Sequence, residues 1–267
     1  MSGFKDHVVW ITGGGSGIGE ALALEFAHRG ARIAVSGRRL DRLQQVAATI
    51  ESNGGQCLAV PCDVCDDGQV QAAVAAVVER FGQLDVAIAN AGYGVAGPFE
   101  EVDAEMWRRQ LDVNVTGAAM TIRHALPHLE QVAGRAVVIS SILGKFSIAG
   151  SAPYCASKFA LVGMCNALHL ELAKSDVSVT NVLPGLVVSE ISKVDNHGQF
   201  REDWRDRRPA LFMWTSQRAA KVIAKAIWRR KREFIFTGHG QLITCLAQYM
   251  PGLMYWLMRV FSVRGRG

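Results

Sequence analysis

The sequence of 267 residues is poor in cysteine and lacks a long apolar run near its beginning. Six cysteines are too few for a disulfide framework in a chain of this length, so we expect free thiols in a reducing compartment. Residues 1–9 carry several charged side chains, and no apolar stretch with a small-residue cleavage site follows them. A secretory signal is therefore not expected, and the prediction is a cytoplasmic protein.

Charge is also balanced rather than strongly one-sided. The chain has 29 basic and 24 acidic residues, which gives a net charge of +5. The excess lies in two local clusters, residues 229–232 and the arginines at 259, 264 and 266, rather than along one helix. Nucleic-acid binding is therefore not expected. Hydrophobic residues make up 49% of the chain and charged residues 20%, which is the composition of a folded globular domain.

Groups of metal ligands are equally scarce. Cys62-x-x-Cys65 is not followed by a second ligand pair, so these two residues are interpreted as structural thiols. His124 and His128 lie one helical turn apart, but Pro127 stands between them and no third ligand is at hand. We interpret them as helix-end residues and predict no metal site.

What is present is a regular alternation of apolar runs and helical patterns. Continuous apolar runs predict strands at residues 8–11, 32–36, 57–61, 84–89, 136–140 and 177–183. Helical spacing predicts helices at 20–28, 40–52, 68–81, 106–126 and 154–174, the fourth of them broken near Pro127. Strands that are apolar on both faces favour a parallel sheet covered by helices on each side. We therefore predict one α/β domain over residues 1–240, a Rossmann-like doubly wound sheet, followed by an apolar extension over 241–267.

A glycine-rich turn joins the first predicted strand to the first predicted helix. Its residues are Gly13, Gly14, Gly15, Ser16, Gly17, Ile18 and Gly19. Glycines allow close approach of a pyrophosphate, and the free N–H groups of the helix N-terminus favour negative charge. The turn therefore predicts a dinucleotide site that includes Gly13, Gly15, Ser16, Gly17, Ile18 and Gly19.

The end of the second predicted strand indicates which dinucleotide binds. A carboxylate at this place would bind the ribose 2′-hydroxyl of NAD, but the sequence here is Ser36-Gly37-Arg38-Arg39. Guanidinium groups are suited to a phosphate. Arg38 and Arg39 therefore favour NADP(H) as the cofactor.

Further motifs follow in a fixed order along the chain. They are Thr12-Gly13-x-x-x-Gly17-x-Gly19, Asp63-Val64, Asn90-Ala91-Gly92, Asn114, Ser141, Tyr154-x-x-x-Lys158 and the loop Pro184-Gly185 with Val187 and Ser189. Over about residues 6–190 the chain resembles the short-chain dehydrogenase/reductase family. One departure is Ser189, where the family usually has threonine; the hydroxyl is retained.

The resemblance implies a role for each motif. Asp63 and Val64 would contact the adenine, and the segments Asn90–Gly92 and Pro184–Ser189 would contact the cofactor. Asn114, Ser141, Tyr154 and Lys158 would be catalytic. Lys158 would also bind the nicotinamide ribose, and Asn114 would hold a water that connects Lys158 to solvent.

Elementary chemistry gives Tyr154 and Lys158 the same roles. A free tyrosine has a pKa near 10, which is too high for easy proton exchange at neutral pH. Tyr154 and Lys158 are spaced i, i+4 and share one helix face, so the ammonium lowers the tyrosine pKa. Ser141 can orient a substrate oxygen by a hydrogen bond.

These observations predict an NADP(H)-dependent oxidoreductase that interconverts a ketone and a secondary alcohol. The apolar tail suggests a lipophilic substrate, and the resemblance gives 3-oxoacyl thioesters, keto-lipids and steroid-like ketones as candidates. Two alternatives stay open: a catalytically retired NADPH-binding scaffold, and a membrane-associated assembly protein that acts through its tail.

The remaining predictions concern surfaces. Residues 201–208 are strongly charged and are interpreted as a solvated helix or part of a mobile lid. Residues 241–258 contain no charge over 18 positions and are divided by Pro251-Gly252, which indicates two short apolar helices. They would contact another subunit, the substrate pocket or a membrane surface, with a true membrane span less favoured. Apolar positions around more than one face of the helix 154–174 (Phe159, Val162, Met164, Leu168 and Leu172) predict a homodimer or homotetramer.

Overall fold

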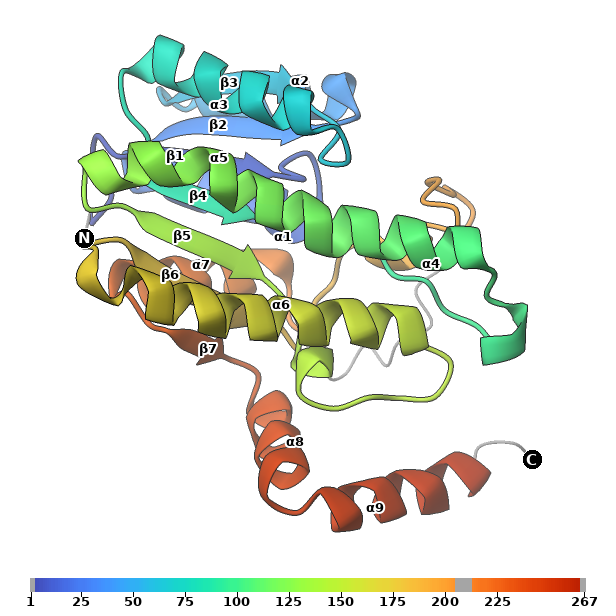
Figure 1. Ribbon diagram of the computed structural model, residues 1–267. Coiled ribbons are helices and arrows are strands. Elements are labelled where there is room, and N and C mark those ends of the chain that lie inside the picture. The colour runs from blue at the N-terminus through green and yellow to red at the C-terminus, as the bar shows by residue number, and fades with distance from the viewer. Residues whose placement is uncertain (1–2, 205–212, 265–267) are drawn as a thin grey trace.

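The computed structural model describes residues 3–204 and 213–264, and its centre is a parallel sheet (Figure 1). Seven strands lie in the order β3-β2-β1-β4-β5-β6-β7 within the described residues. Their bounds are β1 (Val8–Thr12), β2 (Arg32–Gly37), β3 (Gln56–Pro61), β4 (Val86–Ala89), β5 (Arg135–Ile139), β6 (Ser178–Leu183) and β7 (Glu233–Ile235). Each neighbouring pair is parallel, as the continuous apolar runs predicted.

Helices cover both faces of the sheet, which confirms the predicted doubly wound fold. One face is covered by α1 (Gly17–His28), α2 (Leu40–Ser52) and α7 (Ser216–Trp228). The other is covered by α3 (Asp67–Phe81), α5 (Gly117–Gln131) and α6 (Ala152–Glu171), of which α5 and α6 lie in front in Figure 1. The chain moves outward from β1 to β3 and then returns to β4 on the other side of β1. The carboxyl ends of β1 and β4 therefore form the point where a doubly wound sheet binds its ligand.

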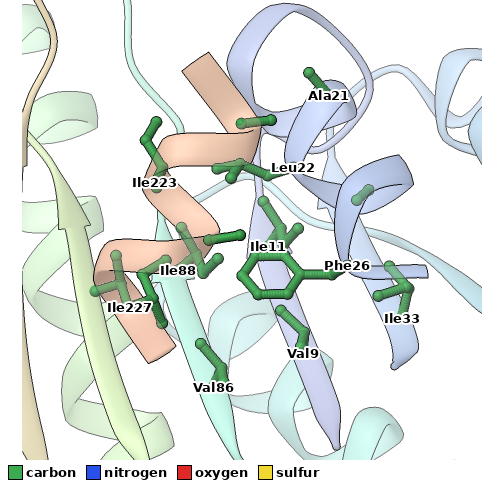
Figure 2. Close-up of a cluster of buried hydrophobic side chains, with 14 of the residues drawn as sticks. Val9, Ile11, Ala21, Leu22, Phe26, Ile33, Val86, Ile88, Ile223 and Ile227 are labelled. Atoms are coloured by element: carbon green, nitrogen blue, oxygen red, sulfur yellow. The ribbon is translucent and has the colours of Figure 1, made fainter. Parts of the chain in front are cut away.

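The core on the α1–α7 face shows why the strands are apolar throughout. Figure 2 shows side chains of β1, β2 and β4 meeting those of α1 and α7: Val9, Ile11, Ala21, Leu22, Phe26, Ile33, Val86, Ile88, Ile223 and Ile227. Phe26 of α1 has no exposed surface and lies across the middle of this cluster. Alternate residues of the same strands, such as Trp10, pack into the core on the opposite face.

α7 and β7 were not predicted from the sequence, and the helix predicted at residues 106–126 ends five residues later than expected. The expected break near Pro127 is wrong, because α5 continues through this proline to Gln131. Ala125 and Leu129 are fully buried on either side of it, so packing compensates for the backbone hydrogen bond that proline cannot donate.

The predicted helix at residues 106–126 is also not one continuous α-helix. It consists of α4 (Ala104–Leu111), a wider π-helical turn over Asp112–Thr116, and α5. The interpretation of His124 as a helix-end residue is also wrong. It lies inside α5, and its Nε2 atom is 2.6 Å from the Asp67 carboxylate on α3.

The apolar positions that predicted an oligomer are mostly buried within the protein. Val162 of α6 is buried in a third small core cluster, and Met164, Leu168 and Leu172 pack against the core beneath α5 and α6. Of the five apolar positions, only Phe159 is strongly exposed, at 43%. One helix can therefore bury most of these side chains because its neighbours differ along its length.

The chain ends in α8 (Gly238–Tyr249) and α9 (Pro251–Arg264), which extend beyond the end of β7 (Figure 1). Met254 of α9 belongs to the third core cluster, together with Phe146 and Val162. Among residues 3–204 and 213–264, no helix is long and apolar enough to cross a bilayer. Of the charged segment 201–208, which was expected to form a helix or part of a lid, residues 205–208 lie outside the described residues, and residues 201–204 contain a turn.

Candidate active site

The glycine turn lies at the carboxyl end of β1 and ends where α1 begins at Gly17. Gly13 and Gly17 have φ values of +65° and +58°, a region that side chains other than glycine rarely adopt. A methyl group on Gly13 would lie 2.9 Å from the Ala91 backbone, so the turn requires glycine here for space as well. This tight turn points the first N–H groups of α1 into the space above the sheet, where they favour a pyrophosphate.

Asn90, at the end of β4, fixes the shape of this turn. Its side-chain amide donates hydrogen bonds to the carbonyl oxygens of Thr12 and Gly13, at 2.9 and 3.1 Å. The Thr12 hydroxyl in turn accepts from the backbone N–H groups of Asn90 and Ala91. The Asn90 side chain is therefore used within the protein, and Gly19 packs against the same amide and the Gly13 carbonyl.

Arg38 and Arg39 follow β2 directly and lie at one end of the site. Arg38 donates to the carbonyl oxygen of Gly198 at 3.1 Å. Arg39 donates to the Ser16 hydroxyl at 3.2 Å and to the Glu190 carboxylate at 2.8 Å. The guanidinium of Arg39 also stacks on the Phe200 ring, 5.0 Å from its centre. The basic end of the site is therefore in contact with the segment that follows the Pro184-Gly185 loop.

Asp63 and Val64 follow β3 beside these arginines. Asp63 accepts a hydrogen bond from the Cys65 backbone N–H at 3.0 Å, and Val64 is buried. Burial, together with the charges of Asp63 and Asp66, raises the pKa of the Cys62 thiol to about 11. A thiol with this pKa is neutral at pH 7, which suits a structural residue better than a redox pair.

Tyr154 and Lys158 lie on the first two turns of α6 at the other end of the site. The Lys158 ammonium nitrogen is 5.5 Å from the centre of the Tyr154 ring and donates to the Ile139 carbonyl at 3.1 Å. Burial lowers the pKa of Lys158 to about 8, so the group remains mostly protonated at pH 7. Gly94 packs against the ring, since a methyl group there would lie 3.3 Å from Tyr154.

Ser141 begins a short 3₁₀ turn after β5, close to the Pro184-Gly185 loop. Its hydroxyl oxygen accepts from the Leu143 backbone N–H at 3.1 Å. The next residue, Ile142, donates its N–H to the Pro184 carbonyl at 3.0 Å and connects the two loops. Because Ser141 accepts from the protein, its hydroxyl proton remains available for a substrate oxygen.

Asn114 lies in the π-helical turn and is buried behind the site rather than in it. Its amide accepts from the Tyr93 N–H at 3.0 Å and donates to the Tyr93 carbonyl at 2.9 Å. It also donates to the Ser157 hydroxyl at 3.1 Å, which donates to the Tyr154 carbonyl at 2.7 Å. Asn114 therefore links the segment after β4 to the first turn of α6.

Sequence reasoning missed a second buried amide with the same function. Gln110, one helical turn before Asn114, donates to the Tyr93 carbonyl at 2.9 Å and accepts from the Val95 N–H at 2.6 Å. The i, i+4 spacing of Gln110 and Asn114 was the available signal. Glu190 and Phe200 were also missed, because no local pattern indicates that they contact Arg39.

One cavity of about 590 Å³ joins these parts. With the exceptions of Gly19 and Asn114, its lining includes every residue predicted for the site: Gly13, Gly15, Ser16, Gly17, Ile18, Arg38, Arg39, Asp63, Val64, Asn90, Ala91, Gly92, Ser141, Tyr154, Lys158, Pro184, Gly185, Val187 and Ser189. Its volume falls in the usual range for small-molecule sites, about 300–1,000 Å³. The tight glycine turn, the arginine end and the lysine end together fit a dinucleotide.

This fold and site define a nucleotide-dependent oxidoreductase of the α/β type, and comparison with known proteins agrees. Residues 7–199 match the family described as short chain dehydrogenase. The chain belongs to the short-chain dehydrogenase/reductase family. The human "Dehydrogenase/reductase SDR family member 7" is 32% identical over 265 residues, covering 94% of this chain and 76% of that protein. An uncharacterized oxidoreductase of Myxococcus xanthus (strain DK1622) is 32% identical over 256 residues, covering 96% and 97%.

Solved structures give the same relationship. A short-chain dehydrogenase/reductase from Burkholderia phymatum in complex with NAD has a TM-score of 0.82 at 26% identity, covering 91% of this chain and 93% of that one. An alcohol dehydrogenase from Thermococcus sibiricus complexed with 5-hydroxy-NADP has a TM-score of 0.76 at 25% identity, covering 87% and 96%. Similar folds thus bind dinucleotides with and without a 2′-phosphate.

Proposed function

We propose that the protein is an NADP(H)-dependent oxidoreductase that interconverts a ketone and a secondary alcohol. The observation that carries the proposal is one cavity with Arg38 and Arg39 at one end and Ser141, Tyr154 and Lys158 at the other. The two solved relatives bind different dinucleotides, so the preference for NADP(H) rests on the arginine pair and on the missing carboxylate after β2. When bound, the dinucleotide supplies or accepts the hydride.

In this proposal, Ser141, Tyr154 and Lys158 carry out the proton transfer together. The Tyr154 hydroxyl donates its proton to the carbonyl oxygen during reduction and takes it back during oxidation. The Lys158 ammonium, one turn further along α6, stabilises the phenolate and lowers the pKa of Tyr154. Ser141 donates a hydrogen bond to the same substrate oxygen and orients it. Lys158 also binds the nicotinamide ribose.

Asn114 contributes by position rather than by contact with the substrate. Its hydrogen bonds to Tyr93 and, through Ser157, to the backbone of Tyr154 fix the first turn of α6. We propose that it also holds the water that connects Lys158 to solvent. An error of about 1 Å in such positioning can cost about 10²-fold in rate.

We further propose a lipophilic substrate and a functional role for α8 and α9. Large apolar side chains on these helices are exposed, among them Leu242 at 72%, Tyr249 at 75% and Trp256 at 60%. Such a surface is rarely left bare in water. It either closes over a long-chain or steroid-like ketone or rests on a membrane as a peripheral contact. If neither contact exists, the surface belongs between subunits of a homodimer or homotetramer.

The test is a turnover assay with a panel of ketones of increasing chain length, in which the loss of NADPH absorbance measures the rate. NADPH-dependent turnover that improves with chain length supports the proposal. A retired scaffold would bind NADPH and turn over none of the ketones. If the protein is instead a membrane-associated assembly protein, the full-length form would sediment with membranes, and the form without residues 241–267 would not. Neither form would turn over a ketone.

A further inference from the structure

The segment after the Pro184-Gly185 loop contacts both arginines at the basic end of the site. Arg38 donates to the Gly198 carbonyl, and Arg39 lies between the Glu190 carboxylate and the Phe200 ring. Glu190 also lines the cavity. The groups that the proposed function assigns to the 2′-phosphate are therefore already engaged by the protein, and one of the engaging groups is an acid.

Glu190 is positioned to neutralise this end of the site. One of its carboxylate oxygens lies 2.8 Å from Arg39, and the other lies 3.4 Å from Arg42. Ser189 and Glu190 lie against the glycine turn, since a methyl group on Gly17 would come within 3.2 Å of the Ser189 side chain. The carboxylate thus occupies the space between the turn and the arginines.

The charge of Glu190 also affects a second acidic residue in the same region. Glu20, on the first turn of α1, has a raised pKa because it is partly buried and because the charge of Glu190 is close. Arg42 acts in the opposite direction. A phosphate dianion that enters this region must therefore either displace the Glu190 carboxylate from Arg39 or accept its repulsion.

We infer that Glu190 is a specificity-determining residue whose carboxylate competes with the 2′-phosphate of NADP(H) for Arg39. This inference rests on the proposed function. A dinucleotide with a free 2′-hydroxyl leaves the Arg39–Glu190 ion pair intact, whereas one with a 2′-phosphate must replace it. Glu190 therefore weakens NADPH binding selectively and reduces the preference that the arginines create.

The test is the isosteric substitution Glu190→Gln, which removes the charge and keeps the size of the side chain. Dissociation constants are measured by fluorescence titration with NADPH and NADH, and by calorimetry with adenosine 2′,5′-bisphosphate, which isolates the phosphate end. Because the ion pair is partly exposed, we expect NADPH and the bisphosphate to bind about three- to fivefold more tightly. NADH affinity should change by less than about twofold, which is below the expected gain of the phosphate-bearing ligands. The matched control is Glu202→Gln, an exposed acid of the same segment.

A second variant assigns the effect to the ion pair. In an Arg39→Ala background, Glu190→Gln should change the ratio of the NADPH and NADH dissociation constants much less, because the ion pair that the 2′-phosphate must replace is absent. An unchanged ratio in the Glu190→Gln variant alone overturns the inference, as does equal tightening of both dinucleotides. If the unmodified protein binds NADPH and NADH equally and Glu190→Gln creates a preference, the inference stands and the proposed cofactor preference is wrong.

Discussion

The ammonium nitrogen of Lys158 lies 5.5 Å from the centre of the Tyr154 ring, and both residues project from the first turns of α6. The lysine is buried and donates to the Ile139 carbonyl, so its position is fixed by the end of β5 as well as by the helix. A cation held at this distance stabilises the phenolate form of the tyrosine. The relationship separates the two functions that we propose for this pair: the hydroxyl would transfer a proton, and the ammonium would favour its release.

Tyr154→Phe tests the first of these functions. The ring, which packs against Gly94, is retained and only the hydroxyl is lost. General acid catalysis contributes about 10²–10⁴-fold, so turnover should fall by this factor. NADPH affinity, measured by fluorescence titration, should change little. A variant that retains more than about a tenth of the rate would show that another acid donates the proton.

Lys158→Met tests the cost of the buried ammonium. Burial lowers the pKa of Lys158 from 10.5 to about 8. The folded state therefore binds fewer protons than the unfolded state between these pH values, so the free energy of unfolding rises as pH increases from about 8 to 10.5. Below about pH 8 the folded protein bears the full free-energy cost of burying the charged ammonium.

Replacing the ammonium by a thioether should therefore stabilise the protein at pH 7, by about 2 kcal/mol after the bond to Ile139 is lost. Urea denaturation at pH 7 and pH 10 measures this, and the variant should lose the part of the pH dependence that Lys158 causes. Lys225→Met, an exposed lysine of α7, is the control and should change neither value. A destabilised Lys158→Met variant at pH 7 would contradict the argument.

Arg38→Asp tests the cofactor preference. A charge-assisted contact to a phosphate contributes about 1.5–3 kcal/mol, or about 10- to 150-fold in affinity. The unmodified protein should prefer NADPH over NADH by a factor in this range, and Arg38→Asp should erase or reverse the preference. The charge-matched control is Arg80→Asp on α3, because Arg80 does not line the cavity. Equal affinities in the unmodified protein would falsify the assignment.

The predicted homo-oligomer depends on the outer surface of α6. Phe159 and Leu170 are 43% and 71% exposed on this helix, which lies beside α5 on the outside of the sheet (Figure 1). We expect a dimer or tetramer by light scattering at micromolar concentration, and Phe159→Arg should shift the mass toward the monomer. A monomeric mass for the unmodified protein contradicts the prediction.

The alternation of strands and helices could be predicted because each element carries its own signal. The glycine turn and the Tyr154–Lys158 pair are local patterns of the same kind. The contact between Arg39 and Glu190 joins residues 151 positions apart, and no local pattern indicates it. α7 lies between these cases: its buried Ala219, Ala220, Ile223 and Ile227 have helical spacing and were not recognised. The catalytic and cofactor roles of the site residues remain predictions.

The last prediction concerns the surface of α8 and α9. Met254 packs inward in the third core cluster, whereas Leu242, Tyr249 and Trp256 are more than half exposed. Replacing these three most exposed residues by serine therefore removes much of the apolar surface and keeps the packing of the two helices. No acidic residue occurs after Glu233, and Arg259, Arg264 and Arg266 follow, so anionic lipid would attract this end by about 1 kcal/mol per basic residue near its surface.

Two measurements distinguish the proposed roles. If the surface closes over the substrate, the triple serine variant, like deletion of residues 241–267, should raise the KM for long-chain ketones more than for short ones. If the surface rests on a membrane, the unmodified protein should sediment with anionic vesicles and the variant should not. Val132→Ser, which replaces an exposed apolar residue just after α5, is the control in both assays and should behave as the unmodified protein. A retained chain-length preference, together with no sedimentation of the unmodified protein, would exclude both roles and leave α8 and α9 as a contact between subunits.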